Sequence, residues 1–508
     1  MDTFFTSLRG TRIRLFLTCW LVFILHFSTN FVREHYLVLS IAEDHSFRLD
    51  KYVGLHNDIF ETPNHGAHHG ANPGASMIAV IPYIMFKPVA DKIVTYINSK
   101  RVNQLHEGRQ SIYKDNRPAR VKFYEQVRKR NLDIKFGLVS FITMVFCMAP
   151  LSALGVIFVF QTLIYTGLSN RLSLFMALLY AFGTPIFFRT GYLNQNLMIG
   201  IFGFIGFTLL WQQGNHSKLK IPWRYGLAGF LGGLALLCDY SGLVILVLLP
   251  VYGLLRLMDS NSLQQALKHS LFYVGGAIGP ILLLWFYQWS SFGHPFFPGQ
   301  NYMPPVDWID VGYKGFGIPS RDILTLLLFD YRFGLFVCSP ILLLAFVAPL
   351  LSHYKRSIIP LRETLFILLF FTIFTLFCSC IRYSRLQWVT GIRYIIPVIP
   401  FLFLLTVAVL VRIPRLVTYM LMLVTFTESW CYAMARTVEV ETHGVLNSVV
   451  SVFLNGFQLP WLNTLSKMAQ QYAPFLEEKT ISPFPFFMLW AFLIYGIWVV
   501  KHPQKNLD

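Results

Sequence analysis

The sequence predicts an all-α membrane protein with about twelve transmembrane helices, and three observations support this fold class. Only 13% of the 508 residues are charged, whereas soluble domains carry about 25%. The mean hydropathy is +0.53. Uncharged apolar runs such as 364–381 and 394–411 approach the roughly 20 residues that a helix needs to cross a bilayer. Membrane strands are disfavoured, because barrels alternate apolar and polar residues instead of keeping solid apolar runs.

Charged residues divide the apolar sequence into these spans, and the whole chain is expected to form one polytopic domain. Roughly eleven to thirteen spans fit, because the joins around Asn194 and Asp239 are short. The run Leu15–His26 is not followed by a small-residue cleavage site, so we interpret it as an uncleaved first helix. The spans are expected near 13–31, 136–167, 172–189, 195–213, 224–238, 240–256, 270–291, 334–352, 364–381, 393–411, 415–435 and 484–500.

The chain is strongly basic, with 42 Lys and Arg against 25 Asp and Glu and a formal net charge of +17. Such an excess can indicate nucleic-acid binding, but basic residues also flank membrane helices on the cytoplasmic side. A cytoplasmic N-terminus places most of the short basic loops on that side. We therefore predict a plasma membrane protein of the bacterial inner-membrane kind, with cytoplasmic N- and C-termini and no nucleic-acid partner.

Three long segments then face the outside, namely 32–135, 292–333 and 436–483. The first and largest extracytoplasmic loop needs structure of its own, because long featureless loops are uncommon. Within it, Ala75–Ile97 is expected to form a helix on the membrane surface. The basic stretch 117–130 is expected to form a second surface helix, either solvated or in contact with anionic membrane lipids.

Acidic residues follow the first predicted span closely. Glu34, Asp50 and Asp58 lie on the outer side, with His56 among them. A carboxylate beside an apolar wall has a raised pKa and can serve as a general base. The alternative is an ordinary polar interface loop.

A histidine-containing segment, 62–74, follows these acids. His65, His68 and His69 are potential metal ligands, but the abundance of glycine favours a flexible loop. Neither this segment nor the seven cysteines shows a zinc or disulfide spacing. We predict no cofactor and no metal ligand, and leave a dependence on a divalent metal open.

Arginines gather on the side of the membrane that should carry few of them. Arg332, Arg382, Arg385 and Arg393 all fall on the outer face, and Tyr394 follows the last of them. Guanidinium groups beside an apolar surface suit a phosphate that carries a lipid tail. The alternative is arginine side chains that reach from helix ends to the interface.

Several motifs, in this order along the chain, are similar to those of a known family. An acidic loop, Glu34–Tyr36, follows the first span, and a Pro-Gly turn, Asn72–Gly74, precedes the expected surface helix. Phe292–Gly299 resembles an FG-x-P…G turn, Phe329–Leu342 an RGLF-x-SP segment, and Gly391–Leu402 a G-x-RY-x-x-P-x-x-PFL helix start. Together they resemble the bacterial integral-membrane glycosyltransferases of the GT-C superfamily, the group related to protein O-mannosyltransferases (family 39-like).

The resemblance implies a reaction and roles for these residues. Such enzymes move a sugar from a polyprenyl-phosphate carrier to an acceptor hydroxyl of a lipid or glycan on the outer side of the membrane. Glu34 would be the base or an orienting acid, with Asp58 and Asp50 behind it. The substrate site would contain the following residues: Arg332, Arg382, Arg385 and Arg393 at the donor phosphate, with His56 and Tyr394.

This chain departs from the family pattern at two places. Many relatives carry two adjacent acids after the first helix, where this chain has Arg33-Glu34. Relatives also often carry an acid near 193–196, where this chain has Leu-Asn-Gln-Asn. The alternatives are a transporter or flippase of a lipid-linked or small substrate, and a glycan polymerase or ligase. Few charges lie within the spans, which disfavours the transporter, and the largest outer loop comes early, which disfavours the polymerase.

Overall fold

Helices dominate the computed structural model, which describes residues 7–106, 118–211, 219–354, 356–385, 391–435, 444–472 and 481–499. About 74% of the chain is helical, and the strands in these ranges form a single two-stranded sheet. The predicted all-α class is confirmed. Residues 1–6 and 500–508, the predicted cytoplasmic ends, and parts of the third outer loop, 436–443 and 473–480, lie outside the described residues.

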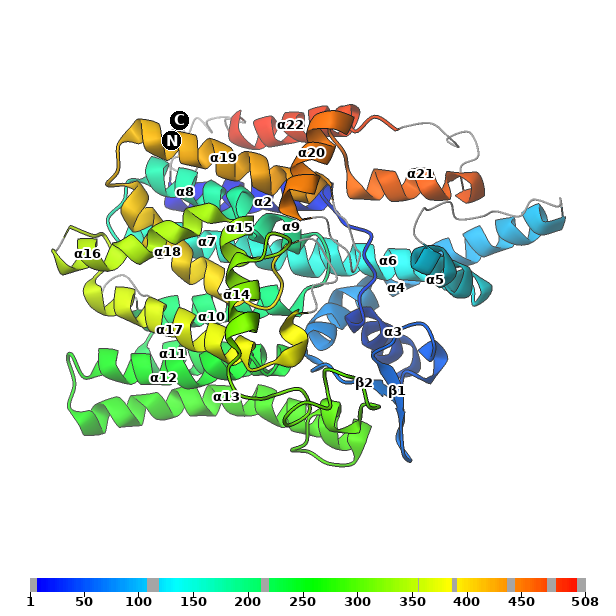
Figure 1. The fold of residues 1–508 in the computed structure, drawn as a ribbon, viewed down its shortest axis with the longest axis horizontal. Coiled ribbons are helices and arrows are strands. Elements are labelled where there is room, and N and C mark those ends of the chain that lie inside the picture. Colours follow the sequence, from blue (N-terminus) through cyan, green and yellow to red (C-terminus); the bar gives the residue numbers. More distant parts are fainter. Residues whose placement is uncertain are drawn as a thin grey trace, which may run out of the picture.

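The helices run largely side by side in one bundle (Figure 1). Their bounds are α2 Leu8–Leu25, α3 Glu34–Asp44, α4 Gly74–His106, α5 Pro118–Lys129, α6 Asp133–Thr143, α7 Ala149–Tyr165, α8 Asn170–Gly183, α9 Ile186–Thr190, α10 Gln195–Trp211, α11 Ile221–Cys238, α12 Gly242–Leu257, α13 Leu263–Phe292, α14 Arg321–Phe329, α15 Leu335–Cys338, α16 Ala348–His353, α17 Leu361–Ser379, α18 Ile399–Leu410, α19 Arg415–Met434, α20 Val445–Asn455, α21 Pro460–Tyr472 and α22 Phe484–Val499. A π-helical turn, Met144–Met148, joins α6 to α7. Short 3₁₀ segments lie at Asp50–Tyr52, Gly299–Tyr302, Pro340–Val347, Arg382–Arg385 and Ile396–Val398.

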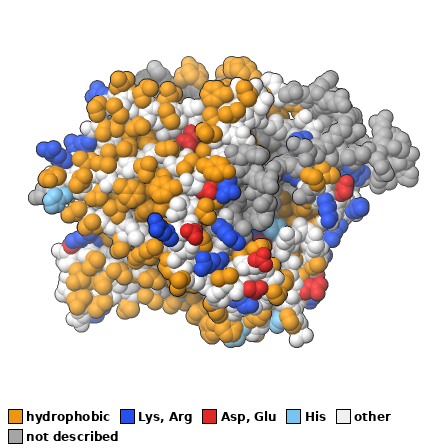
Figure 2. All heavy atoms as spheres, viewed as in Figure 1, with side chains coloured by type: hydrophobic (Ala, Val, Ile, Leu, Met, Phe, Trp, Pro, Cys, Tyr) orange, Lys and Arg blue, Asp and Glu red, His pale blue; other side chains and the backbone are white. Residues whose placement is uncertain are grey.

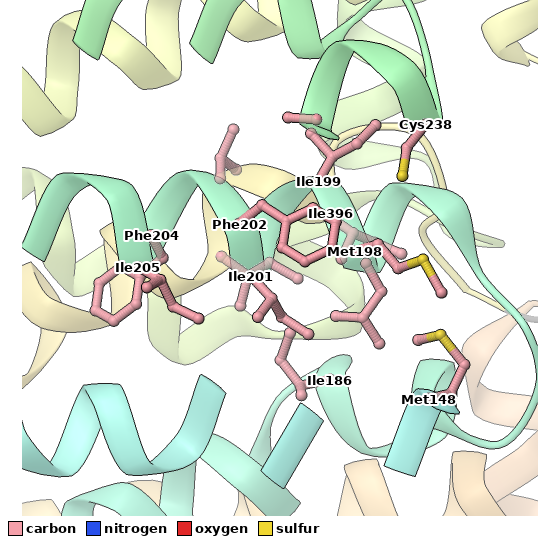
Figure 3. Packing of buried hydrophobic residues seen from close by; sticks show 14 of the residues in the cluster. Met148, Ile186, Met198, Ile199, Ile201, Phe202, Phe204, Ile205, Cys238 and Ile396 are labelled. Atoms are coloured by element: carbon pink, nitrogen blue, oxygen red, sulfur yellow. The ribbon is translucent and has the colours of Figure 1, made fainter. Parts of the chain in front are cut away.

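The centre of the core is α10, whose residues are all buried except Leu209. Its sequence is apolar around the whole circumference, and such a helix is stable only when other helices surround it. Figure 3 shows Met198, Ile201 and Phe202 of α10 with Met148 just before α7 and Ile396 just before α18. Segments far apart in the sequence therefore meet at this helix.

The number of long spans is smaller than predicted. Within the described residues, four helices are long and apolar enough to cross a membrane, or five if the bent pair Val445–Asn455 and Pro460–Lys467 counts as one span. The prediction was about twelve. Five further apolar helices are only 10–17 residues long.

Prolines explain much of this difference, because a proline lacks the N–H that would continue a helix. The predicted span 334–352 divides at Pro340 into α15, a 3₁₀ segment and α16. The span 172–189 divides at Pro185 into α8 and α9. The apolar pattern was interpreted correctly as helical, but it did not show where each helix would end.

The surface of the bundle is apolar to an extent that is compatible with a membrane protein. Figure 2 shows hydrophobic side chains over much of the visible face, with charged side chains near the middle of this face and at its edges. On α13, the side chains of Val274, Ile278, Leu282 and Phe286 are about half exposed and repeat every four residues. One stripe of this helix therefore faces outward with no polar cover.

Both described ends of the chain lie at the same end of the bundle. In α22, the indole of Trp498 donates to the Thr18 hydroxyl over 2.9 Å, and that of Trp490 donates to the Leu21 carbonyl over 2.7 Å. These contacts make α22 antiparallel to α2. The start of α2 therefore lies beside the end of α22.

The first long loop lies at the other end of the bundle, on the right in Figure 1. It contains α3, the hairpin of β1 (Ile59–Thr62) and β2 (Gly66–His69), and then α4 and α5. The strands are antiparallel, with Ile59 opposite His69. The two helices predicted in this loop are confirmed, and α4 continues through Pro82 and Pro88 without a break.

Candidate active site

The site begins at the N-terminus of α3, where packing and a hydrogen bond fix the backbone. Phe31 stacks on Phe136 with ring centroids 3.9 Å apart, and Tyr36 meets the same ring edge-on. The hydroxyl of Ser76, in the first turn of α4, donates to the backbone carbonyl of Glu34 over 2.8 Å. The loop between α2 and α3 is therefore held against both α4 and α6.

Arg33 joins two carboxylates from different segments. Its Nε lies 3.1 Å from Oε1 of Glu34, and its Nη1 lies 2.8 Å from Oδ2 of Asp58. The Glu34 side chain is 6% exposed, whereas that of Asp58 is 28% exposed. Asp58 is thus the carboxylate that a molecule from outside reaches more easily.

Both carboxylates are held in the ionised form. Burial raises the pKa of Glu34, but Arg33 and then Arg393 lower it by more, so the net shift is downward. The same balance, with Arg33 as the largest favourable contribution, lowers the pKa of Asp58 to about 2. The expectation of raised carboxylate pKa values was therefore wrong for both residues, because guanidinium charges outweigh desolvation here.

The loop before β1 and the β1–β2 hairpin bring two histidines to these acids. Asp58 donates its backbone N–H to Nδ1 of His56 over 3.0 Å, and Ala71 donates its own to Nδ1 of His69 over 3.2 Å. Burial lowers the pKa of His56, and lowers that of His69 to about 4, with Arg33 contributing in the same direction. Both rings are neutral at pH 7 and carry their proton on Nε2.

His69 keeps a hydrogen-bond donor without a partner. The residue is fully buried, and its Nε2 has no hydrogen-bond partner in the part of the chain that the structure describes. Arg33, Glu34 and Asp58 all act electrostatically on this ring, which places it within the cluster. A buried unpaired donor costs about 1–3 kcal/mol, so a donor like this is a candidate contact for a ligand.

Arg393 and Tyr394 enter from the segment before α18. Gly391 adopts φ +74° there, and buried Arg189 of α9 donates from Nη2 to its carbonyl over 2.5 Å. The Arg393 guanidinium lies 5.0 Å from the Tyr394 ring centroid. Because Arg393 lowers the pKa of both Glu34 and Asp58, it belongs to the same cluster.

Two of the other predicted residues, Asp50 and Arg332, are paired outside this cluster. Asp50 pairs with Arg48 over 2.8 Å and accepts the Ala67 backbone N–H over 2.7 Å, so it supports the hairpin. Arg332 is occupied by Asp330, which it contacts through both Nε and Nη2 at 3.0 and 2.9 Å. Arg385 is exposed in the turn Arg382–Arg385, and Arg382 is half-buried there.

Of the predicted residues, Glu34, Asp58, His56, Arg393 and Tyr394 are therefore brought together. Arg33, His69 and Arg189 were not predicted as site residues. The sequence could have indicated Arg33 as a site residue, because an arginine next to the first acid of the loop readily forms an ion pair with that acid. No group of three or more His, Cys, Asp or Glu side chains among the described residues is arranged to hold a metal ion.

We refer to Arg33, Glu34, Asp58, Arg393 and Tyr394, with His56 and His69, as the Arg33 cluster. It presents two carboxylates that accept hydrogen bonds from hydroxyls, two guanidinium groups that attract an anion, and one buried N–H donor. Compared with protein-family models, curated proteins and solved structures, the chain matches none.

Proposed function

We propose that the protein is a membrane glycosyltransferase that moves a sugar from a polyprenyl-phosphate carrier to an acceptor hydroxyl of a lipid or glycan. The observation that carries the proposal is the Arg33 cluster, in which two guanidinium groups, those of Arg33 and Arg393, act on an accessible carboxylate, Asp58. It lies at one end of a bundle whose outer surface is apolar. A carrier with a charged phosphate and a lipid tail requires both properties.

The proposed membrane arrangement follows from the same geometry. The start of α2 and the end of α22 lie together, away from the first loop (Figure 1). With these ends on the cytoplasmic side of a bacterial inner membrane, the Arg33 cluster faces outward. Shorter and broken apolar helices then complete the membrane-spanning body around the long ones.

The charges suggest how the donor activates the base. A carboxylate with a pKa near 2 is a weak base, because it is stabilised by Arg33 and Arg393. A donor phosphate that draws these guanidinium groups towards itself removes part of that stabilisation and raises the pKa of Asp58. We propose that Asp58 then accepts the proton of the acceptor hydroxyl, and that Glu34, which is less accessible, orients Arg33.

A reconstituted transfer assay tests this function. Wild type and the variants Asp58→Asn, Glu34→Gln and Asp307→Asn receive a panel of radiolabelled polyprenyl-phosphate sugars. Asp307 is an exposed acid between α13 and α14, so its variant controls for loss of one negative charge on the outer face. We expect Asp58→Asn to lower transfer at least about 100-fold, the usual contribution of a general base, while Asp307→Asn retains it.

Two results contradict the proposal in different ways. If folded wild type neither binds any donor nor transfers sugar from it, the glycosyltransferase hypothesis is rejected. The alternative, a transporter or flippase, is then favoured. Full transfer by Asp58→Asn keeps the class but moves the base to Glu34. The variant Asp50→Asn is expected to lower transfer far less than Asp58→Asn does, because Asp50 supports the hairpin and lies outside the Arg33 cluster.

A further inference from the structure

A third carboxylate, Asp239, lies at the junction of α11 and α12, and the first loop packs directly on this junction. The side-chain amide of Asn72 donates to the Leu236 carbonyl at the end of α11 over 2.9 Å. A Cβ on Gly74 would come within 2.6 Å of the Cys238 nitrogen, so only glycine permits this close approach. The start of α4 is thereby fixed beside Asp239.

The two oxygens of Asp239 have different roles. Oδ1 accepts the backbone N–H of Ser241 over 2.9 Å, which forms a side-chain turn between α11 and α12. Oδ2 accepts a hydrogen bond from Nε2 of Gln195 over 3.2 Å. Since a carboxylate only accepts, this contact fixes the orientation of the Gln195 amide.

That orientation leaves an acceptor unused. Gln195 is 3% exposed, and its Oε1 has no hydrogen-bond partner among the residues that the structure describes. Burying an unpaired acceptor costs about 1–3 kcal/mol. The turn explains Oδ1 of Asp239, but it does not explain why the buried Gln195 amide, at the first position of α10, turns its oxygen towards no donor among the described residues.

Two tyrosines connect Asp239 to the Arg33 cluster. Tyr383 and Tyr394 have ring centroids 6.2 Å apart at an angle of 59°, and both are half-buried. Asp239 acts electrostatically on both phenols, and Arg33 acts on the same two groups. The aromatic pair therefore lies in the electrostatic range of both the Asp239 carboxylate and the Arg33 guanidinium.

The chemistry of these groups selects a class of ligand. Asp239 and Gln195 offer acceptor oxygens, which require a ligand that donates several hydrogens, and the tyrosines offer aromatic faces. A phosphate donates no hydrogens in its ionised form and suits the arginines instead. A sugar ring supplies hydroxyl donors together with a C–H face that packs on aromatic rings.

We propose that Asp239 and Gln195, with Tyr383 and Tyr394, form a subsite that binds the sugar ring of the donor through its hydroxyl groups. This inference rests on the proposed function and adds the part of the site that distinguishes a sugar-bearing carrier from a bare one. Phosphate binding is assigned to Arg33 and Arg393, so the two parts of the donor are recognised separately.

Binding of two ligands tests the subsite. Bare polyprenyl phosphate and a panel of polyprenyl-phosphate hexoses and pentoses are titrated into purified full-length wild type, Asp239→Asn and Asp307→Asn. Asparagine forms the same side-chain turn as aspartate, so the junction of α11 and α12 keeps its hydrogen bond in the variant. We expect wild type to bind at least one sugar-bearing carrier about tenfold more tightly than bare carrier, and Asp239→Asn to bind both with nearly equal affinity.

A second variant and the control complete the design. Gln195→Met keeps the length of the side chain, removes both polar atoms and leaves the Asp239–Ser241 hydrogen bond intact, so it is expected to lose the same preference even if Asp239→Asn folds poorly. Asp307→Asn is expected to keep the preference. A preference that survives in both folded subsite variants overturns the proposal, as does an equal loss of affinity for bare and sugar-bearing carrier.

Binding of free monosaccharides distinguishes a failure of the sugar subsite from a failure of the proposed function. If wild type binds neither carrier, saturation-transfer NMR with the free sugars is measured on wild type and Asp239→Asn. A signal that depends on Asp239 keeps the sugar subsite while the carrier-dependent function fails. The absence of any sugar signal, with no carrier binding, overturns both.

Discussion

Arginines and carboxylates meet at both ends of the helix bundle, and the two groups differ in what they leave unpaired. At the end away from the first loop, Asp259 contacts Arg256 at 3.2 Å and Arg362 at 2.5 Å. Glu363 accepts the Tyr252 hydroxyl over 2.9 Å and lies 3.8 Å from Arg256. Every carboxylate of this α12–α17 network has partners within the network, and the pairs tie the end of α12 to the start of α17.

The Arg33 cluster uses the same residue types in another way. Its members come from the start of α3, the segment before β1, the end of β2 and the segment before α18, which are far apart in the sequence. Around it, the Nε2 donor of His69 and the Oε1 acceptor of Gln195 have no partner among the described residues. In the α12–α17 network, Nε of Arg256 also lacks a hydrogen-bond partner among the described residues, but it lies 3.8 Å from the Glu363 carboxylate. The unpaired atoms around the Arg33 cluster belong to neutral groups, which a ligand can satisfy.

Removing one arginine from each group gives the largest expected contrast in stability. Arg33→Met leaves the buried Glu34 and the half-buried Asp58 carboxylates without their shared cation, and removing the partner of a buried charge such as Glu34 costs about 3 kcal/mol. Arg362→Met removes a pair whose side chains are 45% and 38% exposed, which is worth at most about 1 kcal/mol. Unfolding in detergent, followed by circular dichroism, measures both. Equal destabilisation would show that the two groups are alike.

Acid is expected to reduce the stability that the Arg33 cluster gives the fold, by somewhat less than Arg33→Met does. The folded-state pKa of Asp58 lies near 2, below its ordinary value, so its stabilisation is complete above about pH 4 and is lost as the pH falls towards 2. The shift corresponds to about 2 kcal/mol. We expect the unfolding midpoint of wild type to fall over this range more steeply than that of Asp58→Asn. Parallel curves for the two proteins would contradict the assignment.

A substitution at Gly391 probes the support of the cluster and has the smallest expected effect. Alanine there strains a backbone at φ +74°, and its Cβ would lie 2.7 Å from the Phe188 ring, so we expect a loss of about 1.5 kcal/mol and weaker donor binding. The matched control is Gly279→Ala in α13, where no atom lies within 4 Å and alanine favours the helix by about 0.5–1 kcal/mol. Thermal unfolding and donor titration of both variants check this. Normal donor binding by Gly391→Ala would separate this turn from the site.

The composition of the site was only partly predictable. Glu34 and Asp58 stood out because acidic residues follow the first apolar span closely, and Arg393 because it is a cation on the outer face. Asp50 looked equivalent to Asp58, but the hairpin uses it to bind the Ala67 backbone N–H. The direction of the carboxylate pKa shifts was wrong, because it depends on the distance to Arg33 and Arg393, and a linear sequence contains no such distance.

The sequence by itself determined that the chain is helical and apolar, since hydrophobic residues outnumber charged ones along almost every segment and low charge does not depend on the fold. It also located α4 and α5 in the first loop. The tertiary structure decided where helices end, as at Pro185 and Pro340, and which polar residues meet. Neither Arg189 at Gly391 nor Gln195 at Asp239 follows from local pattern, because each contact joins helices or loops that become neighbours only when the apolar faces of the bundle pack together.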